Sequence, residues 1–338
     1  MSQRLDSLLA RLMTRRDALV RSLRHRSRLA NLMDALDRLI QLSRLQGALD
    51  LRCLLSGEWA LDHPPAPPSE AVYHVVLEGT CWLKFRGQED VRIAAGDIVM
   101  LPRGDAHALQ GVESSDQIMP REMQSQFNGA VTVRTNCSPG AASLDLLCGR
   151  FNYAANALLI DVLPDIVKMS FARDDVPDLT RMVGMMRRES AEAEPGAHSI
   201  VSALSTALFT MLLRAHLAQQ PSKTDVLALL AHPRLGASII AMLERPAEKW
   251  TIEMLAQQSA MSRATYARAF GALTDDSPMT LLTRIRMQLA GTLLVRTTKS
   301  IAEIADDVGY QSESAFSKKF KDTYGAGPGA YRQARLAG

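Results

Sequence analysis

Cysteine is scarce in this sequence: four residues in 338, with no pair at C-x-x-C spacing. This excludes a disulfide-rich secreted scaffold and makes a reducing cytosol the expected compartment. No apolar run reaches the roughly 18 residues of a membrane span, so no membrane partner is expected. Residues 1–32 are interrupted by arginine every few positions and lack the apolar segment of a secretory signal. We therefore expect a cytoplasmic protein.

Several catalytic signatures are also missing. The sequence has no serine or cysteine nucleophile triad, no phosphate-binding glycine loop and no zinc cluster. We expect a protein that is not an enzyme and that holds no cofactor.

The composition is that of a globular protein, with 47% apolar and 22% charged residues, and the length suffices for two domains. The net charge of +3 conceals an uneven distribution. Residues 1–32 carry +6, residues 33–232 carry −7 and residues 233–338 carry +4. A basic end behind an acidic middle indicates a nucleic-acid-binding domain joined to a domain of another kind.

The first 32 residues alternate leucines with arginines in the pattern of a basic amphipathic helix. Three interpretations remain open. The segment is a solvated helix or disordered extension, or it is upstream translated sequence with Met33 as the natural start. It is otherwise an arm for targeting, a membrane surface or nucleic acid.

From residue 49 to about 118 the pattern predicts short strands. The β-rich runs cover 51–55, 72–77, 81–85, 91–93 and 98–101, separated by Gly and Pro turn signals. A polar, weakly ordered excursion over 120–143 precedes a last predicted strand pair at 144–153 and 157–161. This spacing indicates a small barrel or sandwich, which we assign to a domain over 33–170.

Beyond residue 162 the apolar period becomes helical, with predicted helices over 179–192 and 199–219. The second has one apolar stripe, formed by Ile200, Leu204, Leu208, Met211, Leu212 and Ala215. The stripe is either core of the domain or a dimer seam. We assign 171–220 as a helical dimerisation segment and 221–234, with Pro221 and Pro233, as a linker.

Residues 300–320 carry the clearest motif. Ser300 and Glu303 form a capping box that starts a helix, and Gly309 suits a sharp turn at positive φ. Ser312 caps a second helix whose free face is polar and cationic, as a helix in the major groove requires.

The same plan occurs 49 residues earlier. Thr251 caps residues 252–258 and Ser262 caps 263–270, while Ala260 replaces the turn glycine, which costs strain or changes the turn. A helix over 279–295 joins the two units. Two recognition helices about 34 Å apart would meet successive major grooves on one DNA face. The domain with both helix-turn-helix units covers 235–338.

Residues 251–332 resemble the DNA-binding domain of AraC/XylS-family transcription regulators. The matching stretch runs from Ser300 to Lys321 and continues at Pro328 and Tyr331-Arg332. The resemblance implies seven helices and double-stranded promoter DNA as the partner, with RNA polymerase a second partner if the protein is an activator. By position it places base contacts on Ala264, Arg268, Glu313, Ser314 and Lys318. Arg263 and Lys319 complete the expected DNA-binding set, with Lys319 suited to backbone contact or packing.

Residues 96–107 fit G-x5-P-x-G-x2-H, the second motif of cupin barrels, whose histidine, here His107, points into the barrel. The first motif is degraded to His74 and Glu78. Metal-dependent cupin enzymes usually present three histidines and a glutamate. We therefore expect satisfied barrel histidines and no metal. The alternative is a metal-dependent cupin enzyme with an appended DNA-binding domain.

Residues 33–170 as a whole resemble the cupin sensor domain of one AraC-family subgroup. Some members respond to oxidants such as reactive chlorine through cysteines at the positions of Cys53 and Cys148. Three roles remain open for the pair: a redox switch, inert core, or the lining of a small-molecule pocket. His74 and His107 complete the expected sensing set.

The expected fold is α+β: an N-terminal cupin-like β-barrel, a helical dimerisation and linker segment, and a C-terminal all-α double helix-turn-helix domain. The expected function is a cytoplasmic, homodimeric transcription regulator that responds to a small molecule or an oxidant.

Overall fold

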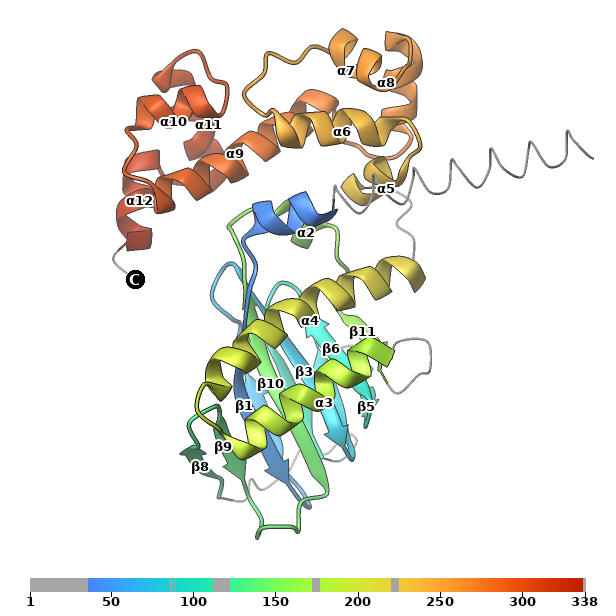
Figure 1. Cartoon of the computed structure of the whole chain (residues 1–338), viewed down its shortest axis with the longest axis vertical. Helices are drawn as coiled ribbons and strands as arrows, with labels where there is room; N and C mark the ends of the chain where they lie inside the picture. The colour runs from blue at the N-terminus through green and yellow to red at the C-terminus, as the bar shows by residue number, and fades with distance from the viewer. Residues whose placement is uncertain are drawn as a thin grey trace, which may run out of the picture. The chain divides into compact units, whose positions relative to one another are not determined.

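The computed structural model describes residues 36–85, 87, 89–111, 122–171, 177–219 and 225–336. The extension over 1–32 and Met33 lie outside the described residues. The chain divides into two compact units, one over Ser43–Pro221 and one that joins Met1–Leu42 to Ser222–Gly338. Figure 1 shows the first as a sheet structure and the second as helices.

Two β-sheets form the N-terminal unit. The larger has the order β11 (Val167–Ser170), β6 (Asp97–Leu101), β3 (Glu70–Glu78), β10 (Leu144–Asn152), β1 (Gln46–Leu55), β9 (Thr132–Thr135) and β8 (Gln124–Phe127). The smaller has the order β2 (Ala60–His63), β7 (His107–Gln110), β4 (Thr80–Phe85) and β5 (Val91–Ala94). Neighbouring strands are antiparallel, except for the parallel pair β1 and β9.

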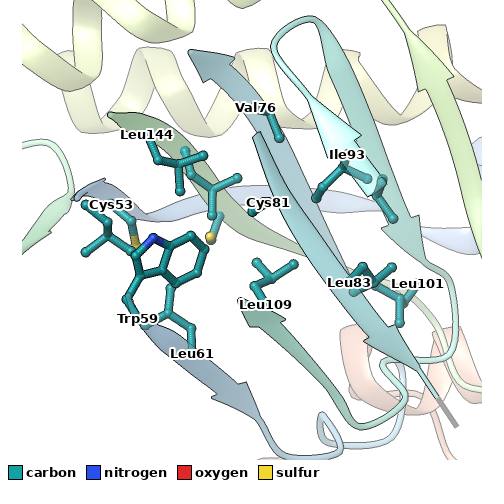
Figure 2. Close-up of a cluster of buried hydrophobic side chains, with 14 of the residues drawn as sticks. Cys53, Trp59, Leu61, Val76, Cys81, Leu83, Ile93, Leu101, Leu109 and Leu144 are labelled. Carbon is teal, nitrogen blue, oxygen red and sulfur yellow. The ribbon is translucent and has the colours of Figure 1, made fainter. Parts of the chain in front are cut away.

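Alternate residues of these strands point between the two sheets and build one core, part of which Figure 2 shows. On β3, for example, Val76 joins this core while Tyr73 and Val75 belong to the opposite face. The apolar side chains close the space between the sheets, as burial on inner faces requires. The predicted barrel-type fold is confirmed.

The outer face of the larger sheet is covered by α3 (Pro177–Glu192) and α4 (Ala197–Gln219) (Figure 1). Tyr73 Oη lies 2.7 Å from Ser205 Oγ, and the Phe151 and Phe209 rings meet edge to face at 5.3 Å. In the apolar stripe of α4, Leu208 and Leu212 are buried against this sheet unit, whereas Ile200 is 40% exposed. Part of the stripe is therefore core of the domain.

One expectation about α4 needs correction. Residues Ala197–Leu217 have a mean hydropathy of 1.5 and are long and apolar enough to cross a membrane, by length and composition only. Scattered Ser, Thr and His residues interrupt the apolar residues of this segment, so the sequence pattern alone does not indicate a span. In the structure the helix packs on β1: the Gly47 amide donates to Thr206 Oγ1 at 2.9 Å. The apolar composition of α4 thus serves its contact with the sheet.

The strand assignments were wrong in places. Residues 157–161, predicted as a strand, form the short helix α2 (Leu158–Asp161). A single helical turn buries its three consecutive apolar side chains, whereas a strand would point them to alternate faces. The strands β2, β7 and β11 are not among the predicted ones, and the polar excursion contains β8 and β9. Part of the predicted linker is also helical: α5 (Val226–Ala231) begins at Asp225, whose carboxylate accepts the Leu227 and Ala228 amides.

Residues 235–336 form seven helices. They are α6 (Leu235–Glu244), α7 (Ile252–Gln258), α8 (Arg263–Gly271), α9 (Pro278–Arg296), α10 (Ile301–Asp307), α11 (Glu313–Tyr324) and α12 (Pro328–Leu336). The helix-turn-helix pairs are α7–α8 and α10–α11, and α9 connects them (Figure 1). The predicted all-helical domain with two such units is confirmed.

Candidate functional site

The second helix-turn-helix unit begins with a complete capping box. The Glu303 amide donates to Ser300 Oγ at 3.2 Å, and the Ser300 amide donates to Glu303 Oε2 at 2.7 Å. Two amides that the helix cannot satisfy itself are thereby paired. Gly309 then takes a φ of +83° in the turn, and the Ser312 hydroxyl accepts the Ala315 amide at 3.2 Å to start α11.

The packing of this unit explains the size of its turn residues. Gly309 lies where an added Cβ would be 2.6 Å from the Ala247 carbonyl oxygen and 2.8 Å from Arg286 Nη2. Ala305 is buried in the cluster that also contains Phe316 and Phe320. A side chain at 309 would therefore push the turn away from its neighbours. With glycine the turn packs closely against them, and this contact sets the direction in which α11 leaves the turn.

The first unit repeats the plan with one difference. Thr251 Oγ1 accepts the Met254 amide at 3.2 Å, and Ser262 Oγ accepts the Thr265 amide at 3.3 Å. Ala260, which replaces the turn glycine, has a φ of +50°. The turn therefore keeps the left-handed conformation. Of the two expected outcomes, strain at the alanine or a different turn, the structure has the first.

Two arginines of α9 have structural partners. Arg286 donates from Nε to the Pro246 carbonyl at 2.8 Å and from Nη2 to the Glu248 carbonyl at 2.9 Å. Arg284 pairs with Asp276 at 2.9 Å. Arg286 is thus a packing residue that holds the segment before α7 to the connecting helix.

The seven predicted DNA-binding residues all lie in the two second helices, and all seven are exposed. They are Arg263, Ala264 and Arg268 in α8, and Glu313, Ser314, Lys318 and Lys319 in α11. On α8 the buried side is Tyr266 and Phe270, and on α11 it is Phe316 and Phe320. Arg263 Nη1 is paired with Glu253 Oε1 at 2.9 Å. The remaining face of each helix is open to a large partner.

Inside the barrel, His74, His107 and Cys148 form a continuous chain of polar contacts. His107 Nδ1 lies 2.8 Å from the Asp105 carbonyl oxygen, and His107 Nε2 lies 2.8 Å from His74 Nε2. His74 Nδ1 lies 3.2 Å from Cys148 Sγ. Because a carbonyl only accepts, neutral His107 carries its proton on Nδ1, so His74 donates from Nε2 and accepts from the Cys148 thiol.

A third histidine, His63, joins this cluster, and sequence reasoning missed it. His63 ends β2 opposite His107 on β7, and the two rings stack with centroids 4.6 Å apart. His63 Nε2 is buried and has no hydrogen-bond partner. The expectation of satisfied barrel histidines concerned His74 and His107, which both have polar partners, and did not include His63. Its sequence context, directly before Pro64 and Pro65, indicates only a turn.

The surroundings keep the three imidazoles neutral. Burial, with the neighbouring His107 acting in the same direction, lowers the pKa of His63 to about 4. Burial lowers the pKa of His74 well below its ordinary value, with the two other histidines acting in the same direction. Burial also lowers the pKa of His107, against the raising effect of the Asp105 carbonyl. Neutral imidazole is the form that binds metal ions.

Glu78, the one carboxylate that the degraded cupin motif offers, does not reach the cluster. It ends β3, its side chain is 59% exposed, and it forms an ion pair with Arg187 of α3. The cluster of metal-ligating side chains in the described part of the barrel therefore consists of histidines alone.

The thiols of Cys53 and Cys148 lie next to this cluster. Both cysteines are reduced and buried, and their side chains hydrogen-bond to each other. This bond lowers the pKa of Cys53 and raises that of Cys148, because a thiolate at Cys53 accepts the remaining S–H. Burial raises the pKa of Cys81, in the same core, to about 12.

Comparison with known proteins places both units. Residues 34–218 match the Cupin family, and residues 255–334 match the Helix-turn-helix domain family. The chain is 34% identical to the HTH-type transcriptional regulator MtrA of Neisseria gonorrhoeae, over 89% of this chain and 98% of the relative. It is 32% identical to the RCS-specific HTH-type transcriptional activator RclR of Escherichia coli, over 89% and 98%. An uncharacterised HTH-type transcriptional regulator of Haemophilus influenzae is also 32% identical, over 89% and 99%.

The matches cover nearly the whole length of these relatives, all of which are named as transcriptional regulators. They support a regulator and give no support to the alternative of a metal-dependent cupin enzyme. The cupin barrel lies within the residues of the first family match, and the double helix-turn-helix lies around those of the second. The chain belongs to the AraC-like HTH-type transcriptional regulators with an N-terminal cupin domain.

Proposed function

We propose that this regulator reads promoter DNA through α8 and α11, and that its cupin domain controls the reading in response to a small molecule or an oxidant. The observation that carries the reading step is the exposure of all seven predicted contact residues on the two second helices. Arg268 suits guanine O6 and N7, and Glu313 suits cytosine N4, because these groups complement each other in the major groove.

The reading step is tested by charge reversal on each helix. Sites selected from random duplexes by the full-length protein supply the DNA for a mobility-shift assay. Arg268→Glu and Lys318→Glu should each abolish the shift, because a carboxylate then faces the DNA. Arg181→Glu reverses an exposed charge on α3 of the other unit and serves as the matched control. Unchanged binding by Arg268→Glu would contradict the role assigned to α8.

For the sensing step, the pair of Cys53 and Cys148 supports an oxidant response. The two residues lie on adjacent antiparallel strands but not opposite each other: Cys53 faces Leu146, and Cys148 faces Leu51. A disulfide needs Cα atoms no more than about 7 Å apart. A diagonal pair on adjacent strands lies at this limit or slightly beyond it, so forming the bond would shift β1 against β10. Hypochlorous acid would accept the two electrons and yield chloride and water as the thiols lose their protons.

That shift has a route to the outer face of the sheet. Arg52, beside Cys53, forms a buried bidentate pair with Asp145 of β10, at 2.9 and 2.7 Å. Arg52 also donates to the Arg187 carbonyl of α3 at 3.4 Å. A change of register between β1 and β10 would therefore strain the contact between sheet and helix. The relative named an RCS-specific activator supports an oxidant response in this family.

We further propose a cytoplasmic homodimer, with RNA polymerase as a partner where the protein activates transcription. The exposed apolar side chains of Met185 on α3 and Ile200 on α4 support a dimer seam on the helical face of the cupin unit. Analytical ultracentrifugation of Ile200→Glu tests this: the variant should sediment as a monomer. A variant that remains dimeric would place the seam elsewhere.

A further inference from the structure

We propose that His63, His74 and His107 bind one divalent transition-metal ion inside the cupin barrel. The three residues come from both sheets: His74 lies on β3 of the larger, and His63 and His107 lie on β2 and β7 of the smaller. One ligand atom of each lies within 4.8 Å of the others. A metal at this place would thus join the two sheets.

The spacing of the nitrogens fits such an ion. A tetrahedral ion with metal–nitrogen bonds of about 2.1 Å separates its ligand atoms by about 3.4 Å. The nitrogens here range from the 2.8 Å between His74 Nε2 and His107 Nε2 up to the limit of 4.8 Å. Small rotations of the three rings, widening one contact and closing the others, reach the required spacing.

One nitrogen of the cluster lacks a hydrogen-bond partner. His63 Nε2 is buried without a hydrogen bond, which costs free energy unless another ligand satisfies it. A bound cation would use the lone pair of that nitrogen. No other polar group of the described residues is hydrogen-bonded to it.

The far sides of two rings already have the acceptors that metal-bound histidines need. His107 Nδ1 donates to the Asp105 carbonyl, so the lone pair of Nε2, which faces His74 Nε2 at 2.8 Å, is the one that would bind a metal ion. His74 Nδ1 faces Cys148 Sγ at 3.2 Å. Metal at His74 Nε2 would displace the proton from that atom and put a proton on Nδ1, so Cys148 would change from donor to acceptor. Such outer contacts fix the orientation and basicity of the ligands.

The donor set selects the class of ion. Three neutral imidazoles without a carboxylate favour zinc, copper, nickel or ferrous iron over magnesium and calcium, which prefer oxygen ligands. Glu78, which would have added a carboxylate, is paired with Arg187 on the outside. The site therefore belongs to borderline transition metals.

The test uses the full-length protein, purified without a histidine tag and stripped with a chelator. Zn²⁺ is titrated in competition with a chromophoric chelator, and bound metal is counted after gel filtration. The wild type should bind one equivalent. His63→Gln and His107→Gln should each weaken binding at least about 100-fold, because each removes one of three ligands. His216→Gln, a partly buried histidine on α4, is the matched control and should bind as the wild type does.

A second readout, independent of the competing chelator, accompanies the titration. Zn²⁺ should raise the melting temperature of the wild type and of His216→Gln, and leave that of His63→Gln unchanged. His63 ends its strand and is only partly buried, so this variant should still melt cooperatively. A wild type that binds no zinc, copper, nickel or ferrous ion, or a His63→Gln variant that binds as tightly as the wild type, would overturn the proposal. Neither result depends on DNA binding.

Discussion

His74 and Cys148 face each other on β3 and β10, with His74 Nδ1 3.2 Å from Cys148 Sγ. This contact joins the two chemical groups of the barrel, the histidine cluster and the thiol pair. An event at either group changes the hydrogen bonding of the other, because His74 has one ring nitrogen in each. The histidine cluster and the thiol pair are therefore linked through His74 and Cys148.

The thiol pair predicts a specific oxidation product. One equivalent of hypochlorite should produce a disulfide-linked peptide pair that contains Cys53 and Cys148, detected by mass spectrometry without reduction. Cys53→Ser and Cys148→Ser should each abolish it. Cys81→Ser, which changes a third thiol of the same core, should retain it. If Cys53 and Cys148 stay free while transcription still responds to hypochlorite, the thiols are not the sensor.

The buried ion pair between Arg52 and Asp145 predicts asymmetric mutational effects. The two side chains are 11% and 6% exposed, so removal of one leaves a buried charge without its partner. Asp145→Ala should lower the free energy of unfolding by about 3–5 kcal/mol. The double variant Arg52→Met/Asp145→Leu should lose much less, because no charge is left behind. Urea unfolding followed by tryptophan fluorescence measures both, and equal losses would contradict this account.

The two turns predict opposite effects for exchanges between glycine and alanine. Gly309→Ala should destabilise the C-terminal unit by more than 1 kcal/mol, on the order of the left-handed penalty plus the clash with Ala247. Ala260→Gly should stabilise it by up to about 1 kcal/mol, since Ala260 is exposed and has a φ of +50°. Urea unfolding followed by far-ultraviolet circular dichroism decides, and effects of the same sign would refute the argument.

The capping box predicts a local loss of stability. Ser300→Ala removes the acceptor of the Glu303 amide and should cost about 1 kcal/mol. Ser314→Ala changes an exposed serine one residue inside α11 and should stay within about 0.5 kcal/mol of the wild type. The same circular-dichroism assay compares the two. A null effect at Ser300 would mean that water replaces the cap.

The helix-turn-helix elements were predictable because their signals are local. Thr251, Ser262, Ser300 and Ser312 each cap the helix that follows, so the starts of α7, α8, α10 and α11 follow from single residues. Gly309 marked its turn in the same way, since a φ of +83° favours glycine.

The barrel was less predictable because its signals are long-range. The run at 157–161 was assigned as a strand, since a short apolar run does not distinguish strand from helix. The sequence around His63 indicates only a turn, because its partner His107 lies 44 positions later and only the pairing of β2 with β7 brings them together. The thiol pair was suggested by resemblance, and its contact with His74 follows from the register of β3 and β10.

The central claim, that α8 and α11 read DNA together, is tested most directly by methylation interference on a selected site. Methyl groups at guanine N7 block major-groove contacts, so interference should appear in two clusters about 10 base pairs apart on one face. Arg268→Glu and Lys318→Glu should each prevent binding to that site. A single cluster, or two clusters that persist in both variants, would contradict the account.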